Sequence, residues 1–386
     1  MIKWSEGDRL AMRRALFLAG KGLYSSFENP RVGACFVKDN EVIAEGFHSS
    51  PGFPHAEIEA MGQADPRLFK GSTCLVTLEP CSHVGRTAPC ADALIEAGVS
   101  RVVIAMEDPN PLVSGQGIQR LRVAGIRVDV GLYRDDAKQL NPGFIKRMTQ
   151  GYPWIWIKSA ASLDGKIAMA DGRSQWITGT EARLDVQRLR ARCHAIMTGI
   201  NTVLMDDPRL TVRHEEAGIF LPHAVPGRQP LRVIVDTTGR LPHDAKLIAV
   251  DGPILWVTAF EVQHPALKSG RLEHWLAPQI GGRIDLVALM IELARRSINE
   301  VMVEAGPTLS GSLISYGLID AGVLYFAPKL LGRAALSLYD LSPPHLADAP
   351  EIFIEKVQSV GQDLRLDWTL RTRNYNGFSF CGNSHL

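Results

Sequence analysis

Apolar residues in the first 150 positions follow helical and extended spacings in turn. After Ser5, which can cap a helix with Asp8 three residues on, apolar residues recur every three or four positions. The apolar runs 33–38 and 41–47 predict two strands joined as a hairpin. Further runs predict strands at 73–79, 101–106 and 126–130. Helices are predicted with Pro54 in the first turn, starting at Pro89, and near 118–123. This alternation is typical of a layered α/β domain.

The pattern restarts around Gly151, which predicts a domain boundary there. A chain of 386 residues favours two or three domains, since one domain takes roughly 150 residues. We therefore predict a first domain at 1–150, a second at 151–373 and a polar tail at 374–386. In the second domain, the runs predict strands at 154–161, 195–198, 232–236, 254–258, 301–304, 323–326, 352–357 and 364–370, and helices at 180–192 (capped by Thr180), 286–294 and 309–316.

Composition and charge narrow the class of protein. Hydrophobic residues make up 46% of the chain and charged residues 22%, which allows a core in each half. The net charge of +1 and the lack of a long basic run argue against nucleic acid or a membrane surface as the partner. No apolar run approaches the roughly 18 residues of a membrane span, and no secretory signal is visible. We therefore expect a cytoplasmic protein whose six cysteines are free to bind metal.

Three residues between positions 55 and 90 make a set of zinc ligands, namely His55, Cys81 and Cys90. Three protein ligands leave the fourth tetrahedral position open for water, as in catalytic zinc sites. Zinc lowers the pKa of such a water to near neutrality. Glu57, two residues after His55, can carry protons without being a ligand. A His-x-Glu followed by Pro-Cys and a second Cys is the arrangement found in zinc-dependent base deaminases.

Two other interpretations of these residues are open. A structural zinc would need a fourth ligand, for which His83 is the nearby candidate, and two core cysteines would need no metal at all. Glu57 and the two Pro-Cys pairs favour a catalytic site, because a closed site has no use for them. The chain departs from the general deaminase pattern at one point, since eight residues rather than two separate Cys81 from Cys90.

That insertion makes the sequence recognisable. The segment Glu79-Pro80-Cys81-Ser82-His83-x-Gly85-Arg86-Thr87-x-Pro89-Cys90 resembles the bifunctional deaminase–reductase family of riboflavin biosynthesis. The likeness continues in the family's order over nearly the whole chain. It includes Asp108-Pro109-Asn110-Pro111, Ser162-Leu163-Asp164-Gly165-Lys166, Ser174-Gln175-Trp176-Ile177-Thr178, Asp206-Asp207-Pro208-x-Leu210-Thr211-Val212-Arg213, Val303-Glu304-Ala305-Gly306-Pro307-Thr308 and Ala327-Pro328-Lys329-Leu330-Leu331-Gly332.

The resemblance implies a cytidine-deaminase-like three-layer domain followed by a dihydrofolate-reductase-like domain. It implies that the first domain uses zinc to deaminate 2,5-diamino-6-(5-phosphoribosylamino)pyrimidin-4(3H)-one. The second domain would then use NADPH to reduce the ribosyl group to ribityl, giving 5-amino-6-(5-phosphoribitylamino)uracil. In the first domain it implies substrate contacts from Asn29, His48, His83 and Arg86. Arg86 suits a phosphate, because a guanidinium binds oxygen atoms in pairs.

The second domain shows no Gly-x-Gly-x-x-Gly after a predicted strand, so the common dinucleotide fingerprint is absent. Residues 304–312 follow a strand and open a helix, where a phosphate can bind, although an ordinary strand-to-helix turn looks the same. The resemblance implies cofactor contacts from Ala160, Trp176, Thr202, Asp206, Gly306, Pro307, Thr308, Leu309, Ser310, Gly311 and Ser312. It implies substrate contacts from Ser174, Arg190, Leu210, Arg213 and Glu304.

Two other functions fit parts of the sequence. One is a nucleic-acid base deaminase with a fused binding domain, against which the near-zero net charge weighs. The other is a binding module in which zinc only holds the fold. The enzyme interpretation predicts a small-molecule substrate, and we expect a homo-oligomer, most simply a dimer.

Overall fold

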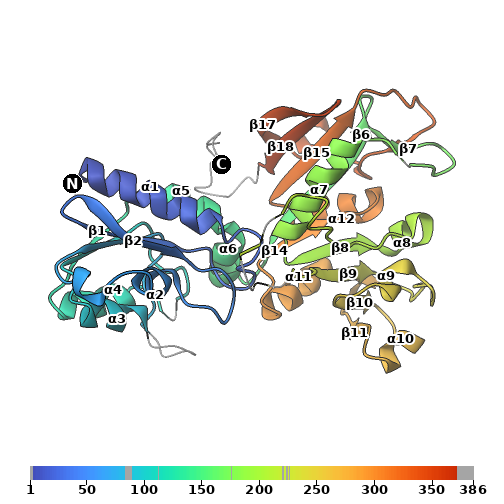
Figure 1. Cartoon of the computed structure of the whole chain (residues 1–386). Coiled ribbons are helices and arrows are strands. Elements are labelled where there is room, and N and C mark those ends of the chain that lie inside the picture. The colour runs from blue at the N-terminus through green and yellow to red at the C-terminus, as the bar shows by residue number, and fades with distance from the viewer. Residues whose placement is uncertain are drawn as a thin grey trace. The chain divides into compact units, whose positions relative to one another are not determined.

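The computed structural model describes residues 3–82, 89–111, 113–174, 176–219, 221–222, 225 and 227–371. The chain forms two compact units, one built mainly on residues up to Gly151 and the other mainly on residues from Tyr152 onward. Each unit contains its own central sheet (Figure 1). In this part of the chain no helix combines the length and the apolar character needed to cross a membrane. The predicted tail at 374–386 lies outside the described residues.

The first unit is built on a five-stranded sheet in the order β2-β1-β3-β4-β5. β1 pairs antiparallel with β2 and β3, whereas β3, β4 and β5 run parallel. The strands are β1 (Gly33–Lys38), β2 (Glu41–Phe47), β3 (Thr73–Val76), β4 (Arg101–Ile104) and β5 (Arg127–Val130). The helices are α1 (Glu6–Gly20), α2 (Ala56–Met61), η1 (Pro66–Leu68), α3 (Cys90–Glu96), α4 (Gln116–Val123), α5 (Arg134–Leu140) and α6 (Pro142–Gln150).

Helices cover both faces of this sheet (Figure 1). On one face, α1, α5 and α6 pack through residues such as Met12 against Leu75 and Val103. On the other face, α2, α3 and α4 pack through residues such as Leu94 and Leu121. The central residues of β1, β3 and β4 (34–36, 74–76 and 102–104) are apolar and buried on both faces, as expected for a sheet enclosed between two helical layers. The predicted three-layer α/β domain is therefore confirmed.

Most local predictions for this unit are confirmed. Ser5 caps α1 in a capping box with Asp8, and the hairpin of β1 and β2 has the predicted bounds. The placement of Pro54 in the first turn is wrong, because His55 is the N-cap of α2 and Pro54 precedes it. The strand predicted at 73–79 ends at Val76, and the prediction missed α5 and α6.

The second unit is built on a nine-stranded sheet in the order β11-β10-β9-β8-β14-β6-β15-β18-β17. All neighbouring strands from β11 to β15 run parallel, and β18 and β17 extend the sheet antiparallel. The nine strands are β6 (Trp154–Ser162), β8 (Ala195–Gly199), β9 (Leu231–Val235), β10 (Ile254–Thr258), β11 (Glu273–Leu276), β14 (Glu300–Val303), β15 (Ala321–Ala327), β17 (Ile352–Val360) and β18 (Asp363–Leu370). Two small sheets pair β7 (Lys166–Ala168) with β16 (Leu336–Ser337) and β12 (Gln279–Ile280) with β13 (Arg283–Ile284).

The helices of this unit pack on the sheet through separate apolar clusters. α11 and α12 contribute Leu293 and Leu313 to the largest of them. α8, α9 and α10 enclose Trp256, and α7 packs against Tyr325 of β15. The helices are α7 (Thr180–Arg192), α8 (Ile200–Asp206), α9 (Lys246–Ala249), α10 (Pro265–Lys268), α11 (Leu286–Arg295), α12 (Pro307–Ser315) and η2 (Leu346–Asp348).

The predicted elements of the second unit are present, with shifts at their ends. The cap of α7 was predicted wrongly, because Gly179 rather than Thr180 is the N-cap residue. The prediction also missed α8, which follows β8 without a loop, and the exposed strand β11. These elements are short, so each contains too few residues for its hydrophobic periodicity to be recognised in the sequence.

Candidate active site

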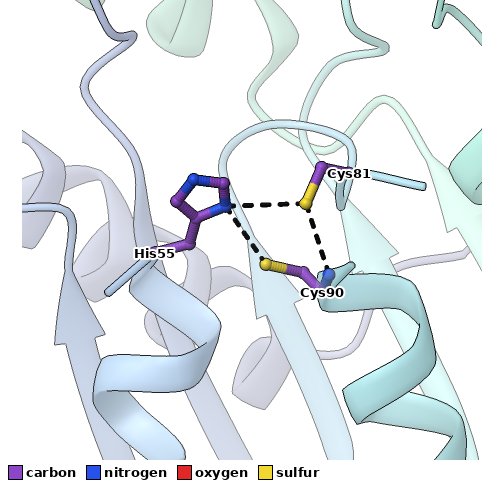
Figure 2. Close-up of side chains that lie close together, drawn as sticks. All are labelled: His55, Cys81 and Cys90. Carbon is purple, nitrogen blue, oxygen red and sulfur yellow. Dashed lines mark hydrogen bonds between the residues drawn. The ribbon is translucent and has the colours of Figure 1, made fainter. Parts of the chain in front are cut away.

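The predicted zinc ligands lie together in the first unit (Figure 2). His55 is the N-cap residue of α2, and Cys90 is the first residue of α3. Cys81 lies in the segment that follows β3. The N-terminal ends of two helices and the segment after β3 therefore bring the three side chains to one point.

The spacing of these atoms fits a metal ion. The Nδ1 atom of His55 lies 3.3 Å from the sulfur of Cys90 and 3.5 Å from that of Cys81, and all three ligand atoms lie within 4.8 Å of one another. Ligands at zinc-binding distance and tetrahedral angles are roughly 3.3–3.8 Å apart. The described residues contain no other group of three His, Cys, Asp or Glu side chains placed in this way. A site of one imidazole and two thiolates suits zinc rather than magnesium or calcium.

The local electrostatics favour loss of a thiol proton. The hydrogen bond from the Cys90 thiol and the contact with His55 together outweigh burial and lower the pKa of Cys81 well below that of an ordinary thiol. The same hydrogen bond raises the pKa of Cys90. The backbone N–H of Cys90 also donates to the Cys81 sulfur at 3.3 Å, at the positive end of α3. Cys81 is therefore the thiol that ionises first in the metal-free protein.

Glu57 lies in the first turn of α2 and is 3% exposed. Burial raises the pKa of its carboxyl group, and the charge of His55 offsets part of this effect. A carboxyl group whose pKa is raised toward neutrality exchanges protons more readily at neutral pH than an ordinary one. Glu57 is therefore placed beside the ligand set as a group able to accept and return a proton.

Two of the predicted substrate contacts lie together beside His55. The Nδ1 atom of His48 bonds the carbonyl oxygen of Pro54 at 3.0 Å, so it must donate. Burial lowers the pKa of His48, so its ring is neutral and Nε2 is left to accept from the Asn29 amide at 2.9 Å. The rings of His48 and His55 meet edge to face, with centroids 5.5 Å apart. His83 and Arg86, the other predicted contacts, lie outside the described residues.

In the second unit, Arg190 and Glu304 form a buried ion pair. The Nε and Nη2 atoms of Arg190 donate to the two carboxylate oxygens at 2.6 and 3.0 Å, and Nη1 donates to the carbonyl of Thr211 at 3.0 Å. Burial alone would raise the pKa of Glu304, but Arg190 outweighs it and holds the pKa below its usual value. Arg190 therefore does not belong to a solvated helix face.

Lys158 is a functional candidate that the sequence analysis missed. It lies on β6, and burial lowers its pKa, an effect that the charge of Glu304 partly offsets. A lysine within the apolar and small-residue strand Trp154–Ser162 is the signal that could have identified it. The amine, the carboxylate of Glu304 and the guanidinium of Arg190 interact with one another in the second unit.

The other predicted substrate contacts of this unit are placed differently. Leu210 is 2% exposed, packs near Cys193 and has a φ of 53°, an uncommon backbone conformation for leucine. The side chain of Arg213 forms an exposed ion pair with Glu216, and the backbone N–H of Arg213 donates to the side-chain oxygen of Gln187. The structure thus buries the side chain of Leu210 and leaves that of Arg213 near the surface.

Several predicted cofactor contacts come from loops and helix ends. The hydroxyl of Ser174 donates to Asp206, the last residue of α8, at 3.3 Å, and burial raises the pKa of Asp206. Thr202 lies in α8, and Ala160 lies in β6 opposite Tyr325. Trp176 is 65% exposed, with the guanidinium of Arg183 over its ring.

The predicted phosphate-binding turn joins β14 to α12. Gly306 is the N-cap of α12 and Pro307 is its first residue. The φ of Gly306 is −68°, an angle that any residue can adopt, so the backbone conformation does not require glycine here. Farther along, Ser310 donates to the carbonyl of Ala305 and is 2% exposed, and a side chain on Gly311 would overlap the backbone of Asp340. The hydroxyl of Ser312 donates to the carbonyl of Thr308, and Leu309 packs against the core. The first turn of α12, rather than its middle, is the part available to an anion.

Comparison with known proteins places both units in described families. Residues 5–106 match the cytidine and deoxycytidylate deaminase zinc-binding region, and residues 153–366 match the RibD C-terminal domain. The riboflavin biosynthesis protein RibD of Escherichia coli (strain K12) is 47% identical over 363 residues, covering 93% of this chain and 98% of that protein. This chain belongs to the RibD family.

Two solved structures agree over nearly the full length. Acinetobacter baumannii RibD (form 1) has a TM-score of 0.86 and 41% identity, covering 95% of this chain and 99% of that one. A diaminohydroxyphosphoribosylaminopyrimidine deaminase/5-amino-6-(5-phosphoribosylamino)uracil reductase from Thermotoga maritima has a TM-score of 0.82 and 33% identity, covering 94% of this chain and 99% of that one. The prediction of a cytidine-deaminase-like domain followed by a RibD reductase domain of the dihydrofolate-reductase type is confirmed.

As a RibD protein, the chain is a bifunctional enzyme of riboflavin biosynthesis, a deaminase and a reductase that act on a small molecule. Its cofactors are zinc and NADPH. These matches extend over the second unit as well as the first. They favour the bifunctional enzyme over a nucleic-acid base deaminase with a fused binding domain.

Proposed function

We propose that this chain converts 2,5-diamino-6-(5-phosphoribosylamino)pyrimidin-4(3H)-one in two steps. The domain at 1–150 replaces the 2-amino group by oxygen, and the domain at 151–373 reduces the ribosyl group to ribityl. The observation that carries the proposal is the grouping of His55, Cys81 and Cys90 beside the buried Glu57. The name of the Thermotoga maritima relative, which specifies both activities, supports the choice of substrate.

In the deaminase site, His55, Cys81 and Cys90 would hold zinc, which when bound supplies a water activated for attack at neutral pH. Hydrolytic deamination adds water to the ring carbon and releases ammonia, so protons must leave the water and reach the ring nitrogen and the departing amine. Glu57 performs these transfers in turn, because it is buried beside the ligands and its pKa is raised by burial. Asn29, His48, His83 and Arg86 bind the substrate, with the neutral ring of His48 held by Asn29 and Pro54.

In the reductase site, the contacts that support the proposal cluster around the ion pair of Arg190 and Glu304. Ser174, Leu210 and Arg213 complete the substrate contacts of this pair. Ala160, Trp176, Thr202, Asp206 and the segment 306–312 would hold NADPH, which when bound would supply a hydride to the sugar carbon. Positioning dominates such a transfer. Lys158 is a group that could give the accompanying proton to the sugar oxygen, since it lies near Glu304 and its pKa is lowered by burial.

A single assay tests the two-step proposal. Purified protein would be incubated with the diaminopyrimidine phosphoriboside with and without NADPH, and the products identified by mass. We expect the deaminated riboside without NADPH and the deaminated ribityl compound with it. Reduction without deamination, or no reaction with this substrate in zinc-loaded protein, would contradict the proposal.

Gly306→Val should weaken NADPH binding and leave deamination intact. A Cβ atom at Gly306 would meet no other atom within 4 Å, so the substitution should not disturb the fold. The side chain would instead occupy the approach to the first turn of α12, where a phosphate would bind. Loss of one charge-assisted contact predicts roughly tenfold weaker binding or more, measured by fluorescence titration. An unchanged NADPH affinity would remove this turn from the cofactor site.

The physical setting of the enzyme is also proposed. The described cysteines Cys35, Cys74, Cys81, Cys90 and Cys193 form no disulfides, which suits a reducing cytoplasm. We expect the chain to act as a homo-oligomer, most simply a dimer. Sedimentation of the purified protein measures this state, and a monomer at working concentrations would contradict it.

A further inference from the structure

Helix α4 is attached to the segment that precedes Cys81. The carboxylate of Glu79, two residues before the ligand, accepts hydrogen bonds from three backbone N–H groups, one in the loop after β4 and two at the start of α4. They belong to Asp108 at 3.1 Å, Gly115 at 3.0 Å and Ile118 at 3.1 Å. Glu79 is 5% exposed. A buried carboxylate held by several N–H donors at a helix N-terminus is a strong and directional attachment. Glu79 therefore binds backbone rather than acting as a second proton carrier.

The next residue packs directly on the same helix. A Cβ atom on Gly117 would overlap the carbonyl oxygen of Pro80. Position 117 requires glycine because a larger residue would not fit. The backbone conformation does not require it, because the φ of Gly117 is not in the left-handed region. The peptide that leads into Cys81 is thus held between the carboxylate contact of Glu79 and the surface of α4.

Arg120, on the same helix, connects both thiol-bearing segments. Its Nη1 atom donates to the carbonyl of Ser82, the residue after Cys81, at 3.3 Å. Its Nε and Nη2 atoms pair with the carboxylate of Asp92, in the first turn of α3, at 2.5 and 2.8 Å. Asp92 lies two residues after Cys90. One guanidinium therefore spans the two segments that carry the sulfur atoms.

We propose that Glu79 and Arg120 are positioning residues for the metal site, and that α4 fixes the separation of the two sulfur atoms through them. The inference rests on the proposed assignment of Cys81 and Cys90 as ligands. A ligand set that is held in place before the metal arrives does not have to be ordered by the metal, so affinity rises. Neither residue touches the metal or the substrate in this proposal.

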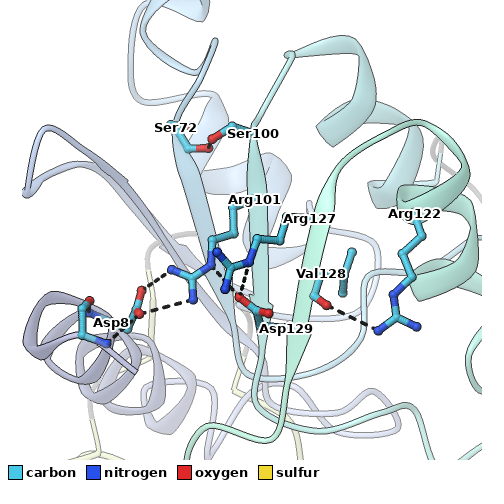
Figure 3. A network of polar contacts seen from close by, with 9 residues as sticks. Asp8, Ser72, Ser100, Arg101, Arg122, Arg127, Val128 and Asp129 are labelled. Atoms are coloured by element: carbon cyan, nitrogen blue, oxygen red, sulfur yellow. Dashed lines mark hydrogen bonds and ion pairs between the residues drawn. The ribbon is translucent and has the colours of Figure 1, made fainter. Parts of the chain in front are cut away.

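The exposure of the Arg120 and Asp92 side chains makes it possible to test the positioning role apart from any general contribution to folding stability. The side chain of Arg120 is 47% exposed and that of Asp92 35%, and such surface pairs add little to folding stability. Arg120→Ala should therefore fold normally. Arg122 offers a matched control on the same helix. It is exposed, and among the described residues its guanidinium donates to the carbonyl of Val128 at 3.4 Å, within the network of Figure 3 and apart from the thiol-bearing segments.

The experiment measures zinc affinity of the full-length protein by competition with a chelating dye. Losing a partner that orients a ligand typically weakens metal binding about 10–100-fold, which we expect for Glu79→Gln. For Arg120→Ala, whose contacts are partly exposed, we expect about threefold to tenfold. Arg120→Lys should recover part of the loss, because its amine can make one of the two connections. Arg122→Ala should match the wild type. The absorption spectrum of the cobalt-substituted protein should change for the Glu79 and Arg120 variants only.

The outcomes distinguish failure of the positioning role from failure of the proposed ligand assignment of Cys81 and Cys90. If Cys81→Ser keeps full zinc affinity, the ligand assignment itself fails. If Cys81→Ser loses zinc while Arg120→Ala and Glu79→Gln bind it as tightly as Arg122→Ala, the ligand assignment stands and the positioning role is overturned. Equal losses in Arg120→Ala and Arg122→Ala would also overturn it, since they would indicate a general effect on α4.

Discussion

Glu57→Gln should abolish deamination and leave reduction intact. The substitution keeps the size and polarity of the side chain but removes the group that carries protons. Removing a general acid–base usually costs about 10²–10⁴-fold, and Glu57 is proposed to serve more than one transfer, so the loss should lie toward the upper end. Zinc content should not change, because Glu57 is not among the three proposed ligands. The measurement is the rate of each step on its own substrate, with zinc determined by elemental analysis.

The reciprocal control is Asp206→Ala in the second unit. This variant should deaminate at the wild-type rate and accumulate deaminated, unreduced product, because Asp206 is a proposed cofactor contact and accepts a hydrogen bond from Ser174, a proposed substrate contact of the reductase site. A folded Glu57→Gln protein that also failed to reduce the deaminated substrate would show that the two activities do not reside in separate sites.

Cys81→Ser should remove zinc and deaminase activity together. Serine keeps the approximate size of cysteine but does not supply a thiolate, and the lowered pKa of Cys81 favours ionisation of this thiol. The loss of zinc affinity should exceed the roughly 10–100-fold typical of residues that only orient a ligand. Zinc per chain, measured by elemental analysis after dialysis, should fall for Cys81→Ser and for Cys90→Ser.

Cys193→Ser is the matched control for these variants. Cys193, like Cys90, is a buried cysteine that forms no disulfide, but it lies in the second unit near Ile196 and Met302. This variant should keep its zinc and its deaminase activity. Full zinc in both Cys81→Ser and Cys90→Ser would rule out the proposed ligand set.

A further expectation concerns acid stability. Arg101 on β4 donates to Asp8 and Asp129 at 2.7 Å, and Arg127 lies 3.0 Å from Asp129 (Figure 3). Burial alone would raise the pKa of Asp8, but hydrogen bonds from Arg101 and Ser5 outweigh it and hold the pKa below its usual value. The charge of Asp8 therefore stabilises the fold above the unfolded carboxyl pKa of about 3.9, and this stabilisation is lost as the pH falls through the lower folded value.

Asp8→Asn should accordingly lower the free energy of unfolding by about 1–3 kcal/mol at neutral pH. Thermal unfolding of both full-length proteins should show a difference that narrows below about pH 4. A difference that stayed constant down to about pH 3 would mean that the charge of Asp8 is not its cause.

The chain's local signals were sufficient for much of the fold. The capping box of Ser5 and Asp8 and the apolar runs of β1 and β2 act over a few residues, so they are visible without tertiary contacts. The residue types His55, Cys81 and Cys90 also identify a metal chemistry by themselves, since thiolate and imidazole ligands select few metals. The substrate and the second activity were not visible in spacing. They were inferred from a resemblance to a known family, and the comparisons with RibD proteins showed that the chain belongs to that family.

Other features depended on contacts between residues far apart in the sequence. The neutral state of His48 follows from its burial, and its contacts with Asn29 and Pro54 set which ring nitrogen carries the proton. Arg190 is buried because it pairs with Glu304, which lies 114 positions away in the sequence. Nothing near Arg120 in the sequence links it to Ser82 or Asp92, which only the packing of α4 brings within reach. The sequence by itself thus determined the short-range elements and the kinds of ligand. The tertiary structure decided burial, charge state and pairing, because these depend on what surrounds a side chain in space.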